Sequence, residues 1–187
     1  MDLYLDIRLL PDPEFPMPVL MNALFAKLHR ALVQLASSRI GLSFPKVDSK
    51  RPMLGECLRL HGSGDHLQQL MDHPWLTGMH DHVALSEMAP VPENTAHRIV
   101  RRVQVKSSPE RLRRRLMRRK GLSEREAWQA IPDEQARFSS LPFVTLNSQS
   151  TGQQFRLFIE HQTPINKPIG GTFNTYGLSL GATVPWF

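Results

Sequence analysis

Residues 18–37 read PVLMNALFAKLHRALVQLAS, and this stretch gives the strongest secondary-structure signal in the first half of the chain. At 100° per residue, its apolar side chains fall on one arc of a helical wheel, opposite Lys27, Arg30 and Gln34. Pro18 suits the first turn of a helix, where no backbone N–H bond is needed. The stretch therefore predicts an amphipathic helix from Pro18 to about Ser37. Its apolar residues are Leu20, Met21, Leu24, Phe25, Leu28, Ala31, Leu32 and Leu35.

Short apolar runs lie on both sides of this helix and are typical of strands. The expected order is a strand at 4–10, the helix at 18–37, strands at 40–44 and 54–61, a helix at 65–72 and a strand at 83–88. This strand–helix–strand–strand–helix–strand order is that of the split βαβ, ferredoxin-like (RRM-like) arrangement. Prolines at 11, 13, 16 and 74 fall between these elements, which favours the same division.

The composition is that of a globular protein with a sizeable core. The chain has 187 residues, of which 41% are hydrophobic and 21% are charged. Its single cysteine, Cys57, and an acidic opening with Asp2 and Asp6 predict a cytoplasmic protein without a secretion signal. Since no apolar run approaches about 18 residues, we expect no membrane span and no membrane partner.

The charge of the chain is divided unequally along its length. Residues 1–94 carry eight Lys or Arg against eleven Asp or Glu, whereas residues 95–187 carry fifteen against six. Between Arg98 and Lys120 there are eleven basic residues and one acid, Glu110. The charge changes sign at Pro90–Asn94, which reads as a linker. We therefore predict a first domain over 1–94 and a smaller C-terminal α/β domain over 95–187 that binds a polyanion.

An arginine-rich helix carries most of this charge. Ser107 and Glu110 fit a capping box, and Gly121 is a typical residue after the last turn, so the helix should end at Lys120. On the wheel, five arginines fall within an arc of about 140°, with Leu112 and Leu116 beside its edge. We expect the helix to dock by these leucines and to present the arginines outward. The five are Arg111, Arg114, Arg115, Arg118 and Arg119.

The rest of the second half predicts further short elements, which makes the whole chain α+β. We expect a strand at 98–105, a helix opened by a second capping box at Ser123 and Glu126 and limited by Pro132, and strands at 143–146 and 155–160. Residues beyond 160 are punctuated by glycines and predict loops.

Guanidinium groups concentrated on one helix face favour nucleic acid, because arginine binds phosphates and guanine edges bidentately. A solvated helix face is the alternative, although this stretch offers few acids to pair with. Charge alone does not distinguish DNA from RNA as the ligand. Arg102 and Gln104 alternate on the predicted strand and so face one side, where they are able to read base edges. Phe155, at a strand start, is either a stacking residue for a base pair or a core phenylalanine.

The histidines give no metal-ligand pattern. His66, His73, His80 and His82 lie near Asp65, Asp72 and Asp81, but the spacing matches no standard metal site. We therefore expect neither a metal nor another cofactor. His29 falls at the border of the first helix's apolar arc, which on its own is typical of a boundary residue. Residues 148–152 read as a polar turn.

Taken together, these residues resemble the repeat-cleaving endoribonuclease of type I-F CRISPR systems, the Csy-type member of the Cas six superfamily. The resemblance covers essentially the whole chain and follows long collinear motifs. They are YLDIR at 4–8, DPEFP at 12–16, KLH at 27–29, RVQ at 102–104, KSSPERLRRRLMRR at 106–119, LPFVTLNSQSTG at 141–152, FRLFI at 155–159, YGLS at 176–179 and VPWF at 184–187.

The resemblance implies a protein that binds a CRISPR repeat hairpin, cuts at the 3′ base of its stem without metal, and stays with the mature crRNA among other subunits of a type I-F Cascade-like complex. It implies catalytic roles for His29, Ser148 and Tyr176, with the ribose 2′-OH as the nucleophile. The products would be a 5′-hydroxyl and a 2′,3′-cyclic phosphate or 3′-phosphate. The implied RNA-binding residues are Arg102, Gln104, Arg111, Arg114, Arg115, Arg118, Arg119, Lys120, Ser150, Thr151 and Phe155.

Two departures and two rival functions accompany this resemblance. Lys120 stands where a close relative would have His, and Asn174-Thr175 before Tyr176 also differs from the close pattern. One rival is a non-catalytic hairpin-binding subunit of an effector complex, and the other is a basic DNA-binding regulator. Metal-independent RNA cleavage excludes the regulator, and its loss on changing His29 excludes the passive binder.

Overall fold

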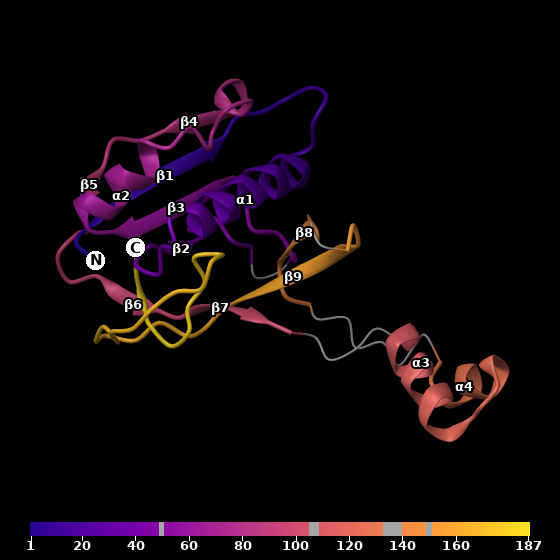
Figure 1. Ribbon diagram of the computed structural model, residues 1–187. Helices are drawn as coiled ribbons and strands as arrows, with labels where there is room; N and C mark the ends of the chain where they lie inside the picture. The colour runs from indigo at the N-terminus through magenta and orange to yellow at the C-terminus, as the bar shows by residue number, and fades with distance from the viewer. Residues whose placement is uncertain (49–50, 105–108, 133–139, 149–150) are drawn as a thin grey trace. The chain divides into compact units, whose positions relative to one another are not determined.

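The computed structural model is a mixed α+β protein and describes residues 1–48, 51–104, 109–132, 140–148 and 151–187 (Figure 1). Its contacts divide the chain into two compact units. Unit 1 consists of Met1–Arg102 and Leu141–Phe187, and unit 2 consists of Val103–Ser140. A domain boundary after Asn94 stays a prediction. No helix in the described part of the chain is both long and apolar enough to cross a membrane.

The elements of the first half confirm the predicted order within a few residues. They are β1 (Leu3–Leu9), α1 (Met17–Gln34), β2 (Gly41–Ser43), β3 (Cys57–Gly62), α2 (Gly64–Met71) and β4 (Val83–Leu85). The strands form one sheet in the order β2-β3-β1-β4, and β1 also pairs with β5 (Ala89–Pro90). The pairs of β1 are antiparallel, with Leu5 opposite Leu60 and Ile7 opposite Leu58.

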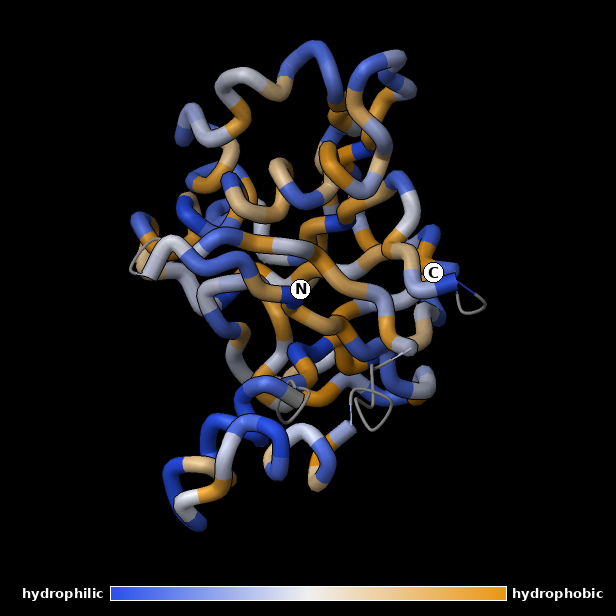
Figure 2. Tube along the Cα trace, turned by 90° about the vertical axis from the view of Figure 1, so that its right-hand side faces the viewer, coloured by the Kyte–Doolittle hydropathy of each residue, from blue (hydrophilic) through white to orange (hydrophobic). Residues whose placement is uncertain are grey.

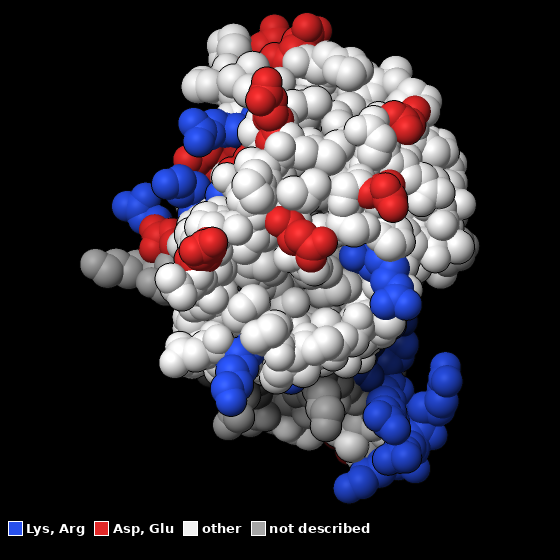
Figure 3. Space-filling model, turned by 90° about the vertical axis from the view of Figure 1, so that its left-hand side faces the viewer, with Lys and Arg blue, Asp and Glu red and all other residues white. Residues whose placement is uncertain are grey.

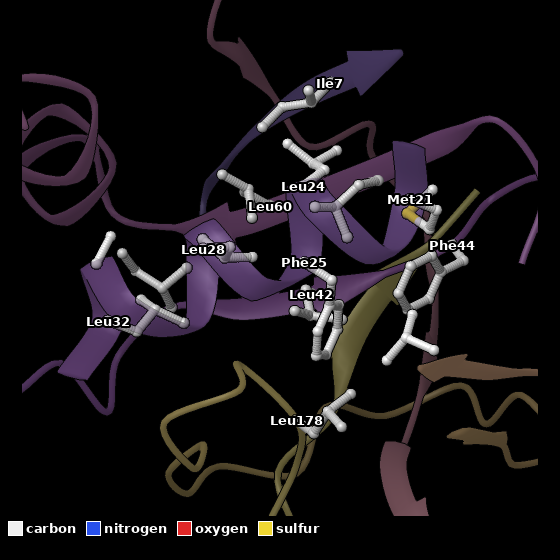
Figure 4. Close-up of a cluster of buried hydrophobic side chains, with 14 of the residues drawn as sticks. Ile7, Met21, Leu24, Phe25, Leu28, Leu32, Leu42, Phe44, Leu60 and Leu178 are labelled. Atoms are coloured by element: carbon white, nitrogen blue, oxygen red, sulfur yellow. The ribbon is translucent and has the colours of Figure 1, made fainter. Parts of the chain in front are cut away.

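Helix α1 packs its apolar face into the core of unit 1 (Figure 4). Leu24, Phe25, Leu28 and Leu32 are fully buried, as the period of the sequence predicts. They meet residues of the sheet and of the C-terminal segment, which Figure 4 labels as Ile7, Leu42, Phe44, Leu60 and Leu178. In Figure 2 orange, hydrophobic stretches of the trace gather in the middle of this unit. The core therefore fixes α1, and with it any side chain on the border of its buried face.

The predicted strand at 98–105 is wrong in its bounds, because the structure divides it into two strands of different sheets. Strand β6 (Ala96–Arg98) pairs with β10 (Val184–Trp186), and β7 (Val100–Val103) pairs in the order β7-β9-β8. Between them, the Ile99 carbonyl accepts a hydrogen bond from the Gln162 N–H at 3.0 Å. The expectation of loops alone beyond residue 160 is also wrong. The short β10 contains Pro185, which hides its strand character in the sequence.

The hairpin of β8 (Phe143–Asn147) and β9 (Gln154–His161) confirms the two strands expected there. Its turn is the polar segment at 148–152, of which residues 149–150 lie outside the described part. The Ser148 N–H donates to the Gln153 carbonyl at 2.9 Å, and the Gly152 N–H donates to the Ser148 carbonyl at 2.8 Å. Gly152 adopts φ +64°, a left-handed conformation that glycine adopts without strain.

Unit 2 contains α3 (Pro109–Lys120) and α4 (Glu124–Ala130). The capping box of α4 is confirmed: the Ser123 side chain accepts from the Glu126 N–H, and the Glu126 carboxylate accepts from the Ser123 N–H at 2.8 Å. The Ser123 hydroxyl also donates to the Glu126 carboxylate at 2.7 Å, and this bond, together with the one from the Ser123 N–H, lowers the pKa of Glu126. The box expected at Ser107 lies outside the described residues. Gly121 follows α3 with φ +65°, and its N–H donates to the Met117 carbonyl at 2.8 Å.

Candidate active site and nucleic-acid interface

His29 lies on α1 and contacts a segment almost 150 residues away in sequence. Its Nδ1 lies 2.8 Å from the Thr175 carbonyl oxygen, and its half-buried ring stacks on Tyr176. The two ring centroids are 3.9 Å apart and the planes differ by 14°. Because a carbonyl only accepts, Nδ1 must carry the proton of this bond. A neutral His29 therefore keeps the lone pair of its other nitrogen, Nε2.

A tight turn holds the residues that His29 contacts. The Asn174 side-chain oxygen accepts from the Tyr176 N–H at 2.9 Å and from the Leu178 N–H at 3.1 Å. Gly177 closes the turn with φ +70°, and a Cβ there would lie 2.8 Å from a Leu42 methyl group. The Gly177 carbonyl accepts from the Leu42 N–H of β2 at 3.0 Å. The turn is thereby bound to the sheet, and the Thr175 carbonyl is aimed at α1.

The Tyr176 ring also contacts Phe25 and Arg102. Its ring packs against Phe25, one helical turn before His29, with centroids 6.0 Å apart. The guanidinium carbon of Arg102, on β7, lies 5.9 Å from the Tyr176 ring centroid, within the range of a cation–π contact. The structure therefore brings His29, Tyr176 and Arg102 together. A catalytic or RNA-binding role for each of them stays a prediction.

Ser148 lies directly after β8, and its side chain is used in the hairpin turn. Its Oγ accepts from the Thr151 N–H at 3.3 Å, and the Thr151 hydroxyl accepts from the Gln153 N–H at 3.4 Å. Strand β8 is joined to α1 because the Thr145 N–H donates to the Asn22 side chain at 2.9 Å. The catalytic role of Ser148 and the RNA contact of Thr151 stay predictions. Ser150 lies outside the described residues.

Phe155 is half-buried and packs against the core of unit 1. It lies opposite Leu146 in the β8–β9 pair, on the face that also carries the buried Leu157. This placement is that of a residue at the border of the core, and stacking on a base pair stays a prediction. Gln104 is exposed and follows the last residue of β7, so the predicted alternation of Arg102 and Gln104 along one strand does not hold to its end.

Six basic side chains of α3 are exposed, and basic side chains crowd together at the lower right of Figure 3. The helix bears the residues predicted for its outer face, namely Arg111, Arg114, Arg115, Arg118, Arg119 and Lys120. Docking by Leu112, however, is wrong, because its side chain is 37% exposed. The buried residue of the first turns is Arg113, which is 8% exposed.

Two of the four histidines between His66 and His82 contact polar side chains. His82 Nδ1 lies 2.9 Å from an Asp12 carboxylate oxygen, and His66 Nδ1 lies 2.6 Å from the Ser63 hydroxyl. Among the described residues, no group of three His, Cys, Asp or Glu side chains is placed to hold a metal ion.

Comparison with known proteins gives the family. The family described as CRISPR-associated protein (Cas_Csy4) matches residues 4–187. A relative named CRISPR-associated endonuclease Cas6/Csy4, from Pseudomonas aeruginosa (strain UCBPP-PA14), is 59% identical over 187 residues, which is all of both chains. A protein of the same name from Escherichia coli (strain UTI89 / UPEC) is 46% identical over the full length of both chains. The chain belongs to the Cas_Csy4 family.

In this Cas_Csy4 chain, sequence reasoning missed two contributors to the His29 environment. Thr175 acts through its backbone carbonyl, for which no side-chain pattern exists. Asn174 orders the turn through its side chain, and its spacing from Gly177 carries a usable signal, since Asn at the first and Gly at the fourth position are typical of a β-turn. Both residues belong to the Asn174-Thr175 pair, at which the sequence departs from the close pattern of the family.

Proposed function

We propose that this chain is an endoribonuclease that binds the hairpin of a CRISPR repeat in precursor crRNA and cleaves at the 3′ base of the stem. The observation that carries the proposal is the hydrogen bond between His29 Nδ1 and the Thr175 carbonyl. It leaves Nε2 of the neutral imidazole as a proton acceptor at a half-buried site. Membership of a family whose named relatives are CRISPR-associated endonucleases supports this assignment.

The proposed reaction uses the nucleophile that RNA itself carries. His29 Nε2 takes the proton of the ribose 2′-OH, and the 2′-oxygen then attacks the adjacent phosphorus. The bond to the 5′-oxygen breaks, and that oxygen takes up a proton. The products are a 5′-hydroxyl and a 2′,3′-cyclic phosphate, which hydrolysis opens to a 3′-phosphate. No metal takes part in these steps.

The other residues hold the reactants in line, which supplies much of the rate in such reactions. Tyr176 stacks on His29 and orients its ring, and Ser148 holds the ribose beside the scissile phosphate. The stacking distance of 3.9 Å and the bond to Thr175 support an orienting role for the turn. Arg102 contacts the Tyr176 ring, which favours an RNA contact near the reacting bond.

Binding rests mainly on the exposed arginines of α3. In the proposal they lie in the major groove of the hairpin stem, which is open to a helix near the ends of a short duplex. Arg102 and Gln104 read base edges, Lys120, Ser150 and Thr151 add contacts, and Phe155 stacks on the terminal base pair. The enzyme then stays bound to the mature crRNA as one subunit of a type I-F surveillance complex.

We also propose a ferredoxin-like layout for residues 1–94. The order β1-α1-β2-β3-α2-β4 and the sheet order β2-β3-β1-β4 support it. In this layout, the catalytic histidine belongs to the first helix, whereas residues 95–187 carry most of the RNA-binding charge.

The test is cleavage of the cognate repeat hairpin in the presence of EDTA. The proposal expects full cutting, with end groups of the kind named above. A hairpin with a single 2′-deoxy nucleotide at the cleavage site should bind with unchanged affinity and remain uncut, since it lacks the nucleophile. Cutting of the deoxy hairpin, or a strict need for a divalent ion, would contradict the mechanism. Tight binding without any cutting of the natural hairpin would favour a passive RNA-binding subunit.

A further inference from the structure

Arg113 differs from its neighbours on α3 because it is buried. The arginines at 111, 114, 115, 118 and 119 are exposed, whereas Arg113 is 8% exposed. At 100° per residue, position 113 falls roughly opposite the middle of the exposed arginine arc. Leu116 and Met117, which flank it on the wheel, are half-buried. The inner face of α3 is therefore centred on an arginine.

Arg113 contacts α4 and the residue that follows it. Its Nε donates to the Ile131 carbonyl, at the C-terminal end of α4, at 2.8 Å. Its guanidinium carbon lies 4.5 Å from the ring centroid of Trp128. Trp128 is 51% exposed, so the arginine covers part of an indole that is otherwise open to solvent. One side chain thus joins the two helices by a hydrogen bond and a cation–π contact.

Helix α3 needs such support more than most helices do. It has 12 residues, a length at which isolated helices are marginal in water. Like charges at Arg111/Arg115, Arg114/Arg118 and Arg115/Arg119 are spaced i,i+4, which destabilises it further. Among the described residues of unit 2, Ala127 is the apolar side chain that is fully buried. Apolar packing therefore contributes little here.

We infer that Arg113 is a positioning residue, which fastens α3 to α4 through Trp128 and Ile131 and so keeps the RNA-reading helix folded before RNA arrives. This inference rests on the proposed function of α3. Arg113 does not itself contact RNA in this arrangement. Without it, RNA would have to order α3 on binding, and this ordering would weaken the affinity.

A salt titration separates this role from a phosphate contact. Each phosphate contact adds about 0.9 to the slope of log affinity against log salt for a duplex of the B-DNA type. Arg113→Ala should therefore weaken hairpin binding about tenfold, a loss typical of one charged hydrogen bond, with the slope unchanged. Arg114→Ala, on the exposed arc, should instead reduce the slope.

Hydrogen exchange of the free protein tests the helix contact without RNA. Arg113→Ala and Trp128→Ala should each speed the exchange of α3 amides, and the double variant should add little, because both changes remove the same contact. Arg113→Lys should behave like Arg113→Ala, because an ammonium keeps the charge but loses the flat stacking group. Leu112→Ala, at the exposed neighbouring position, is the matched control and should leave exchange and affinity unchanged.

Two results would overturn the inference. Unchanged α3 exchange in both single variants would show that the contact does not hold the helix. A salt slope reduced by about one phosphate in Arg113→Ala, with Trp128→Ala like the wild type, would place Arg113 on the RNA. Failure of the wild-type protein to bind the hairpin would instead contradict the proposed function, while faster exchange in the variants would still support the contact between α3 and α4.

Discussion

The surroundings of His29 and the helix pair of unit 2 are built by different means. His29 lies on a helix whose inner face is buried by leucines and phenylalanine, and its partners come from a turn bonded to the sheet. Helices α3 and α4 bury little apolar surface and are joined by Arg113. The proposed chemistry therefore uses a preformed site, whereas the proposed binding surface carries charge at the cost of its own stability.

A substitution at His29 should separate cleavage from binding. His29→Ala should lower the rate of repeat cleavage by roughly a hundred- to ten-thousandfold, the usual contribution of a general base. Affinity for the hairpin should stay within a few fold, since phosphate contacts supply most of it. Single-turnover cleavage and filter binding measure the two quantities. His80→Ala, at an exposed histidine of unit 1, is the control. A parallel loss of binding would contradict the assignment of His29 to chemistry.

The complementary substitution removes two exposed arginines from α3 of unit 2. Replacing both Arg115 and Arg119 with alanine should weaken binding by about a hundredfold or more and flatten the salt dependence, because both face outward on α3. At saturating protein, the cleavage rate should stay close to that of the wild type. Replacing Lys46 and Arg51 with alanine, both at exposed positions of unit 1, removes the same number of charges and controls for net charge. Unchanged affinity would show that the exposed arc is a solvated face.

The sequence carried enough information for elements with strong local signals. The apolar period and Pro18 predict α1, and Ser123 and Glu126 predict the start of α4, because each signal acts within one or two turns. The inner face of α3 was not predictable from its own residues. A helical wheel favours Leu112 over Arg113 as the buried residue. Trp128, which packs against Arg113, belongs to the next helix.

The candidate site was predictable in its residues and not in its geometry. His29, Tyr176 and Arg102 come from three distant segments, and only the resemblance associated them. The Thr175 carbonyl that fixes the His29 tautomer has no sequence signal at all. The sequence predicts one strand where the structure has β6 and β7. The reason is similar, because their partners, β10 and β9, lie far along the chain.

Acid should destabilise unit 1 more than unit 2. Burial lowers the pKa of His61 to about 3 and, together with Arg98, that of His161 to about 4. Because both folded pKa values lie below the unfolded value, stability is fully present above about pH 6.5 and is lost as the pH falls, by up to about 1.4 kcal/mol per pH unit for each histidine. Residues 103–140 contain no histidine.

Hydrogen exchange between pH 7 and 4.5, corrected for intrinsic rates, measures this difference. Amides of the unit 1 sheet should lose protection in acid, and the protection of α3 and α4 should change less. His161→Gln should reduce the pH dependence in unit 1. Equal losses of amide protection in both units would show that the buried histidines do not set the acid sensitivity.

The smallest effect concerns the turn that aims the Thr175 carbonyl at His29. Gly177→Ala should cost about 1 kcal/mol, since an L-residue at φ +70° is strained. Gly78→Ala is a matched control, because Gly78 has φ +76° with no atom within 4 Å of the added Cβ. Gly78→Ala should lose only the strain energy in thermal unfolding, whereas Gly177→Ala also meets Leu42, so it should lose more stability, shift the turn and slow cleavage several-fold. Equal cleavage rates in the two variants would show that the Thr175 contact does not position His29 for the reaction.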